Sequence, residues 1–174
     1  MRYLNKIKFI IIIFLIFQSP LLANVPYFLD FKYILNESDA GKKAQSYLKN
    51  KLTKGVESIK NKEKSIQDEE KKIIQQKKII SADEYKKKVT ELRKRVSSLR
   101  QERNKLLDEV AKERAKARKE ILKNLNPIMK EYMKEKSIRM IIDKKSMLLA
   151  DESLDITKDV MDILNKKLKS IKLN

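Results

Sequence analysis

Apolar residues recur every three or four positions through most of the chain between residues 41 and 136. In the first half of this region they are Leu48, Leu52, Val56, Ile59, Ile66 and Ile73, with Glu63 and Glu70 taking the same rhythm. In the second half they are Val89, Leu92, Val96, Leu99, Leu106, Val110, Ala117, Ile121, Leu125, Ile128 and Tyr132. This spacing gathers the apolar side chains into one narrow stripe of an α-helix. The pattern predicts two long helices that pack along matching stripes.

The two stripes are separated by a signal for a fresh helix start. The sequence "SADE" at residues 81–84 is a capping box, in which Ser81 accepts from the new helix and Glu84 reaches back. We therefore expect an antiparallel hairpin with its tip near residues 79–84. Each arm of about 40 residues would be about 60 Å long at 1.5 Å per residue. Pro127 is expected to kink or restart the second helix.

The two ends of the chain have a different pattern. The stretch "VPYFLDFKYIL", residues 25–35, opens with a short apolar and aromatic run that predicts one strand, with Pro26 near its start. Two further β-prone runs, residues 137–143 and 146–150, are joined by a short polar turn and resemble a hairpin. The two ends are predicted to meet in one small sheet.

A short helix is predicted near the C-terminus. Asp155 or Thr157 would be its N-cap, and one face would carry the apolar residues Val160, Ile163, Leu164 and Leu168. The fold class is therefore α+β, a long antiparallel coiled-coil hairpin on a small β-sheet base. Residues 24–40 and 137–174 would form the base, and residues 41–136 the hairpin.

The first 23 residues have the three parts of a secretory signal peptide. A basic start is followed by an apolar run over residues 9–17, which is too short to span a bilayer, and by the small residue Ala23. Cleavage after Ala23 is expected, and an uncleaved membrane anchor is the alternative. The sequence therefore predicts a protein that works outside a bacterial-type cytoplasm.

Few residue types for catalysis are present. The chain has no His, no Cys and no Trp, and Gly41 and Gly55 are its two glycines. These absences exclude His- or Cys-based nucleophiles, thiolate or imidazole zinc sites and glycine-rich phosphate loops. Carboxylate runs such as residues 68–70 are more typical of a solvated surface than of acid-base machinery. The sequence predicts a binding protein that is not an enzyme, with no cofactor and no metal.

Positive charge is concentrated in the hairpin. The whole chain has 42 Lys and Arg against 24 Asp and Glu, a net charge of +18, and loss of the three basic residues of the signal would leave +15. Residues 41–125 alone carry 27 basic and 13 acidic residues. Such a field attracts anionic partners. In an envelope these are acidic unfolded polypeptides and anionic lipid head groups.

Three segments carry a resemblance to a known family. They are "FLDFKYILNESDAGKKAQSYL" at residues 28–48, the hairpin, and "IRMIIDKKSMLLADESLDITKDVMDIL" at residues 138–164. In order and spacing they are similar to the Skp/OmpH family of periplasmic chaperones, over essentially the whole chain after residue 23. The two outer segments are specific, whereas any coiled coil could imitate the hairpin.

The resemblance implies a homotrimer whose strands complete a β-barrel base, with three hairpins surrounding a cavity. It also implies a holdase function, in which unfolded outer-membrane β-barrel proteins are held without ATP until membrane insertion. Members of the family also contact lipopolysaccharide, but no contact residue matches here, so the resemblance assigns none.

The sequence also suggests candidate site residues and two competing functions. The expected client contacts are Lys60, Lys64, Lys71, Lys86, Lys87, Arg93 and Arg100. The expected trimer base residues are Phe28, Phe31, Ile138, Met140, Ile142 and Leu148. The alternative function is a structural coiled-coil envelope scaffold that binds one folded partner. Nucleic acid is not expected as a partner, because Tyr47 and Tyr85 are the only aromatic residues between 41 and 125.

Overall fold

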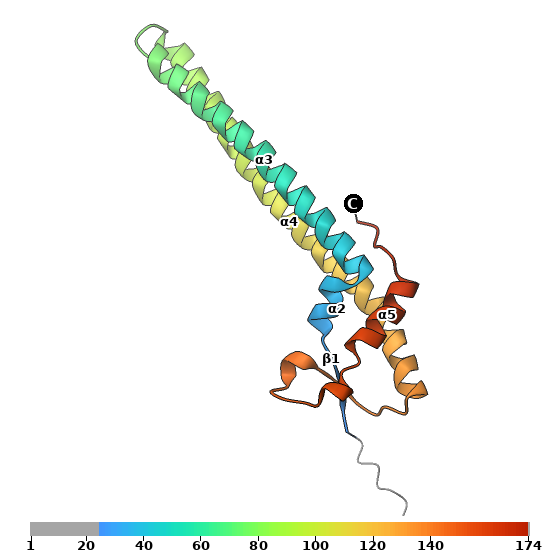
Figure 1. Cartoon of the computed structure of the whole chain (residues 1–174). Helices are drawn as coiled ribbons and strands as arrows, with labels where there is room; N and C mark the ends of the chain where they lie inside the picture. The colour runs from blue at the N-terminus through green and yellow to red at the C-terminus, as the bar shows by residue number, and fades with distance from the viewer. Residues whose placement is uncertain (1–24, 174) are drawn as a thin grey trace, which may run out of the picture.

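The computed structural model describes residues 25–173, so the predicted signal peptide lies outside the described residues. The elements in chain order are β1 (Tyr27–Leu29), α2 (Phe31–Glu37), α3 (Asp39–Gln76), α4 (Ala82–Glu135), β2 (Ile141–Asp143) and α5 (Thr157–Lys167). Two short 3-10 turns, Lys144–Ser146 and Glu152–Leu154, lie between β2 and α5. Figure 1 shows α3 and α4 side by side as a long projection, with the other elements gathered at one end.

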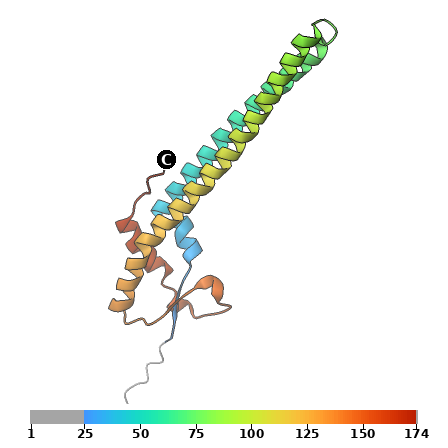
Figure 2. The ribbon, with the colours of Figure 1, turned by 180° about the vertical axis from the view of Figure 1, so that it is seen from behind.

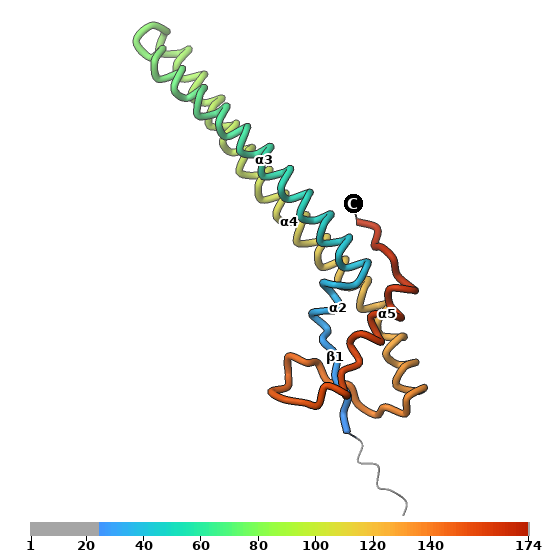
Figure 3. Tube along the Cα trace, viewed as in Figure 1, coloured from blue at the N-terminus to red at the C-terminus, as the bar shows by residue number. Residues whose placement is uncertain are grey.

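The hairpin turns over through a short loop, residues 77–81, which Figure 3 shows at the far end from the base. Ser81 is the N-cap of α4, and its hydroxyl accepts from the Glu84 backbone N–H at 3.2 Å. The structure thus shows the first half of the predicted capping box. Helix α4 then runs to Glu135 without restarting at Pro127. The buried residues Leu125 and Ile128 on either side of the proline pack into the core and hold the helix in place.

The apolar stripe is narrower in the distal half of the hairpin than the sequence suggested. In α3 beyond residue 60 only Ile66 and Ile73 are buried, seven residues apart. Glu63 and Glu70 are exposed and do not lie in the seam. Two stripe residues, Val56 and Val96, are also exposed. The helices therefore contact along a thin line there, with roughly one buried side chain of α3 per two turns.

The strand predicted at the start of residues 25–35 is confirmed as β1, which ends at Leu29. Asp30 caps α2, accepting a 2.8 Å hydrogen bond from the Tyr33 backbone N–H. Ile34 is fully buried, so one face of α2 anchors the base. The helix ends at Ser38, whose own hydroxyl caps α3 by accepting from the Gly41 N–H at 3.2 Å.

The predicted hairpin of residues 137–143 and 146–150 is wrong. In the described part of the chain the sheet has two strands, and β1 pairs with β2 in parallel, Phe28 lying opposite Ile142. After β2, the Asp143 carboxylate accepts from the Lys145 N–H and turns the chain into a 3-10 turn. No partner strand then forms from residues 146–150, and Leu148 and Leu149 project into solvent. On its other side β1 makes one bridge, Phe28 with Asp155.

The core lies where the root of α4 meets α2, α5 and the sheet. Figures 1 and 2 both show α5 against the lower part of α4. The buried cluster contains Leu29, Ile34, Ile121, Leu125, Ile128, Tyr132, Ile138, Ile156, Val160 and Leu164. Of the predicted apolar face of α5, Val160 and Leu164 are fully buried, and Ile163 and Leu168 pack partly buried beside them. Neither proposed N-cap residue is the N-cap of α5, which is Ile156, but Asp155 accepts from the Thr157 N–H and supports this first turn.

Candidate functional site

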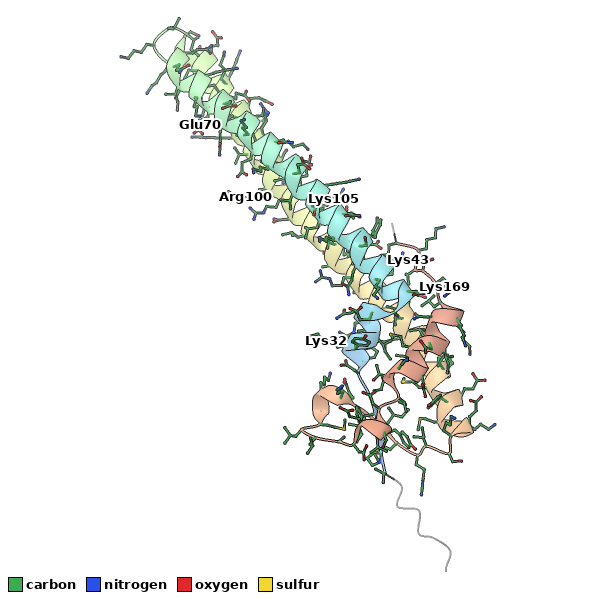
Figure 4. All side chains as sticks on the ribbon, in the orientation of Figure 1. Lys32, Lys43, Glu70, Arg100, Lys105 and Lys169 are labelled. Atoms are coloured by element: carbon green, nitrogen blue, oxygen red, sulfur yellow. The ribbon has the colours of Figure 1, made fainter. Side chains whose placement is uncertain are left out.

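The features of the described residues that suit binding are their surfaces, above all those of the hairpin. Within residues 25–173 no three carboxylates lie close enough together to hold a metal ion. Over the same range, none of the helices combines the length and the apolar character that a bilayer crossing requires. What the hairpin does present is a dense array of cations, which Figure 4 shows pointing outward along both arms, Arg100 and Lys105 among them.

The predicted client contacts are all exposed, but they do not converge on one pocket. On α3, Lys60, Lys64 and Lys71 are four and seven residues apart and share a helix face. On α4, Lys86, Arg93 and Arg100 recur every seven residues and share a second face, with Lys87 beside the first of them. The seven residues therefore form two extended rows, one along each helix.

One flank of the hairpin carries a ladder of contacts between the helices that the sequence reading missed. Lys62 Nζ lies 2.5 Å from Glu102 Oε1, and Arg95 pairs with Glu69. Nearer the tip, Lys88 donates to Gln76 at 3.0 Å. The α4 members of these contacts, at 88, 95 and 102, recur every seven residues, and so do their α3 partners at 62, 69 and 76. This heptad spacing of complementary polar and charged residues was the signal that could have found the ladder.

The ladder neutralises few of the cations. For the seven predicted client contacts, the described residues give one ion pair, between Lys71 and Asp68 at 3.9 Å. The remaining six have no carboxylate within ion-pair distance in the described part of the chain. The arms thus present uncompensated positive charge to solvent.

A groove at the root of the hairpin combines apolar and basic character. It has a volume of about 880 Å³ and lies between the start of α3 and the middle of α4. Its floor contains the small or apolar buried residues Gly41, Ala44, Leu48, Val110, Ala117 and Ile121. Arg114 and Arg118 line it on the α4 side, and Lys42 and Lys49 on the α3 side. Such a groove can hold apolar side chains whose neighbours are acidic, and the sequence reading did not identify it.

The predicted trimer base residues divide into an inner and an outer set. Phe28 and Ile138 are buried within this chain, and Phe31 and Ile142 are half-buried. Met140 is 57% exposed, and Leu148 is fully exposed beside the equally exposed Leu149. A single chain therefore leaves several apolar side chains of the base uncovered.

Two acidic groups tie the base together. The Tyr132 hydroxyl donates to Asp159 at 2.7 Å, and burial together with this bond raises the pKa of Tyr132 to about 12. Partial burial opposes ionisation of Asp155, but hydrogen bonds from Thr157 and the nearby Lys144 outweigh it and lower the Asp155 pKa. The Thr157 hydroxyl also accepts from the Asp30 backbone N–H at 2.8 Å. These bonds fasten α5 to α4 and to the end of β1.

Comparison with known proteins shows which family has this architecture. The profile of a family described as "Outer membrane protein (OmpH-like)" matches residues 27–164. The chain belongs to the OmpH-like family. Among solved structures, a crystal structure of a protein described as an OmpH-like outer membrane chaperone from Caulobacter crescentus superposes with a TM-score of 0.78. The match covers 91% of this chain and 95% of that one at 18% identity, so it shows a shared fold.

A search of the curated proteins finds no match. Membership of the OmpH-like family agrees with the resemblance read from the two outer segments, both of which overlap the matched range. The family assignment therefore rests on nearly all of the described chain and not on the coiled coil alone.

Proposed function

We propose that this OmpH-like protein is an ATP-independent periplasmic holdase that binds unfolded outer-membrane β-barrel proteins and prevents their aggregation until membrane insertion. The observation that carries the proposal is the hairpin, whose arms hold most of the chain's excess charge on two thinly packed helices. Unfolded barrel strands expose alternating apolar residues that aggregate at open edges. A cationic surface attracts such chains when they are acidic, without requiring a rigid pocket.

The root groove supplies the apolar half of this interaction. Its floor of small and apolar residues suits an apolar client side chain, and Lys49, Arg114 and Arg118 at its rim favour acidic neighbours in the client, whereas Lys42 is paired with Glu37 at 3.2 Å. The contacts are numerous and individually weak, which suits a client that must be released without ATP hydrolysis. The two rows of cations would engage the client further along the arms.

The proposed assembly is a homotrimer whose joined bases complete a β-barrel. The outer edge of β2 has no strand partner within the described residues, so another chain can add to it. The exposed Met140, Leu148 and Leu149 lie close to β2 in sequence and would be covered by the same contact. Burying these side chains between copies supplies the hydrophobic stabilisation that a small base lacks alone.

The proposed location is the periplasm, reached by means of the cleaved signal peptide predicted at residues 1–23. Anionic lipid and lipopolysaccharide are additional proposed partners, supported by the net charge of the hairpin. No ATP site is required by this mechanism, because the energy of binding comes from charge and apolar contact.

The first test is the light-scattering mass of the chain lacking residues 1–23, alone and after dilution of a urea-unfolded outer-membrane barrel protein. We expect a trimer that becomes a soluble complex with one client, and client affinity that falls as salt is added. A monomer or dimer that leaves the client to precipitate contradicts the proposal. If the chain ignores unfolded protein but retains one folded partner, the structural scaffold is the correct function.

Matched variants localise the client contacts. Replacing Lys60, Lys64 and Lys71 by Gln should weaken client binding about tenfold or more, because three charges leave one face of α3. The control replaces Lys134, Lys136 and Lys166, three exposed lysines of the base, with the same loss of net charge. Equal weakening in both variants would mean that net charge matters and the α3 face does not.

A further inference from the structure

The tip of the hairpin differs from the rest of the arms. Residues 71–90 carry seven lysines against two acidic residues, Asp83 and Glu84. In the described part of the chain no carboxylate lies within ion-pair distance of Lys72, Lys78, Lys86 or Lys87. Figure 3 shows this segment at the end of the molecule that is farthest from the base. We define residues 71–90 as the tip.

Apolar side chains project from the centre of this basic region. Ile79, in the connecting loop, is 83% exposed, and Ile74 in the last turn of α3 is 60% exposed. The seam of the hairpin is already filled at this level by the buried Ile73. Ile74 and Ile79 therefore add little to the hairpin's packing, and their exposure is unfavourable unless something covers them.

The shape of the tip favours a flat partner over a peptide. The hollow on the α4 side of the tip is lined by Asp83, Lys86, Lys87, Lys88, Thr90, Glu91 and Lys94, so no apolar residue lines it. The exposed isoleucines sit on a convex end, where an extended polypeptide finds no groove. A bilayer with anionic head groups needs no groove, because an apolar side chain can enter between the head groups while surrounding lysines meet the phosphates.

The geometry of the helix ends agrees with insertion end-on. Lys72 lies four residues before the end of α3, and Lys86 and Lys87 lie four and five residues after the start of α4. At 1.5 Å per residue these side chains begin about 6 to 8 Å behind the loop. The head-group layer of a bilayer is about as deep. When Ile79 reaches the acyl boundary, Lys72, Lys86 and Lys87 are therefore level with the phosphates, and the long side chain of Lys78, next to Ile79 in the loop, can extend back to the same level.

We propose that the tip docks end-on onto a bilayer of anionic phospholipids, with Ile79 as its apolar anchor and the uncompensated lysines as its phosphate contacts. Docking through the tip specifies where and how the protein would contact the anionic lipid of the proposed function. Its biological role rests on the proposed function, but the docking itself needs no client. A holdase that docks in this way presents its client at the surface where insertion takes place.

Single tryptophan variants test the insertion, because the chain has no tryptophan of its own. Ile79→Trp should shift its emission to the blue and be quenched by brominated lipid on vesicles of equal parts phosphatidylglycerol and phosphatidylcholine. The control is Leu107→Trp, at a residue 51% exposed in the middle of α4, whose emission should stay unchanged. If both probes shift, the hairpin lies flat on the surface, and if neither shifts, nothing inserts; either result overturns the proposal.

Charge variants test the lysines with the client contacts left intact. Lys72→Gln with Lys78→Gln should lower the partition coefficient onto these vesicles about 25-fold, at about fivefold per lysine. The control, Lys54→Gln with Lys105→Gln, removes the same charge from exposed positions further along the arms and should change it less than twofold. Equal loss in both variants, or equal binding to pure phosphatidylcholine, contradicts docking through the tip.

The outcome can be separated from that of the proposed function. The Lys72/Lys78 variant should still suppress aggregation of an unfolded barrel protein, since neither residue is among the proposed client contacts. If this variant binds vesicles as tightly as the wild type does, the inference about the tip is wrong, even if the holdase assay succeeds. If an acidic unfolded polypeptide shifts the Ile79→Trp emission and the vesicles do not, the tip is a polypeptide site and the membrane proposal is wrong.

Discussion

The base and the distal hairpin differ in how their side chains are packed. The base gathers α2, the root of α4, α5 and the sheet around a cluster of ten buried residues. The distal hairpin has two helices, a line of buried contacts seven residues apart on α3, and a ladder of two ion pairs and one hydrogen bond on one flank. A buried side chain in the base has neighbours on every side, whereas a buried side chain in the arm has neighbours on one side. The two should therefore contribute differently to stability.

This contrast relates stability to use. A well-packed base can hold the orientation of the hairpin and carry an assembly interface. A thinly packed arm remains solvated and adaptable, which suits contact with an unfolded client or a fluid surface. Matched substitutions in the two regions test whether their contributions to stability differ.

The largest effect is expected from cavities. Leu164→Ala in the base should lower the free energy of unfolding by about 4 kcal/mol, because the side chain is fully buried among several elements. Ile66→Ala in the arm should cost about 2 kcal/mol, because solvent can fill the space on one side. Urea unfolding at one protein concentration measures both, and hydrogen exchange should show the second loss confined to the hairpin. Equal losses would remove the distinction between the two regions.

The two glycines give the next comparison. A Cβ on Gly41 would lie 2.1 Å from the Leu35 carbonyl oxygen, where backbone of α2 cannot move aside. Gly41→Ala should therefore destabilise the base by about 3 kcal/mol. A Cβ on Gly55 meets the end of the Leu106 side chain, which can rotate away, and alanine favours a helix by about 1 kcal/mol. Gly55→Ala should change thermal stability little, and a severe loss there would show that the arm is as tightly packed as the base.

A smaller effect, with a pH signature, is expected at Tyr132. Tyr132→Phe removes the hydrogen bond to Asp159 and should cost about 1 kcal/mol at neutral pH, because the exposed Asp159 regains water. The folded-state pKa of Tyr132 is raised from 10.0 to about 12, so its contribution is complete below pH 10 and is lost as pH rises toward 12.

The difference in stability between wild type and Tyr132→Phe should therefore shrink between pH 10 and 12. Urea titrations of both proteins at several pH values measure this difference, in which the titration of the lysines cancels. A gap that stays constant over this range would mean that the hydroxyl is not held by Asp159.

The smallest effect is expected on the ion-pair ladder. Lys62→Gln breaks a pair whose side chains are both about half exposed, and exposed pairs contribute little. The stability loss should be below about 0.5 kcal/mol and should vanish in high salt. A larger loss that salt does not remove would show that the flank stabilises the arm in place of the missing apolar contacts.

Much of the hairpin could be predicted from local pattern. The break at "SADE", with Ser81 as the cap, and the second apolar stripe were readable because helix periodicity and capping act over a few residues. The thin distal seam was not readable. Val56 and Val96 fit the spacing, but the path of one helix over the other leaves both exposed.

The base was predicted less well, because its structure depends on contacts between residues that are far apart in the sequence. Residues 31–35 are apolar and aromatic, which favours a strand, yet the Asp30 cap and the burial of Ile34 against α4 and α5 make them helical. Residues 146–150 are β-prone, but a strand needs a partner, and the turn made by Asp143 leads this segment away from the sheet. Which of Phe28 and Leu148 is buried in the chain also depended on contacts far apart in sequence.

The sequence by itself therefore determined the two long helices, their connection, the excess of positive charge and the absence of His and Cys chemistry, because each follows from residue type and short-range spacing. Only the tertiary structure decided the parallel pairing of β1 with β2, the packing of α5 on α4, the root groove and the exposure of Ile79. These features depend on which surfaces pack together, and such contacts join residues that are far apart in the sequence. The hydrogen bond from the Asp30 backbone N–H to the Thr157 hydroxyl, for example, joins residues 127 positions apart.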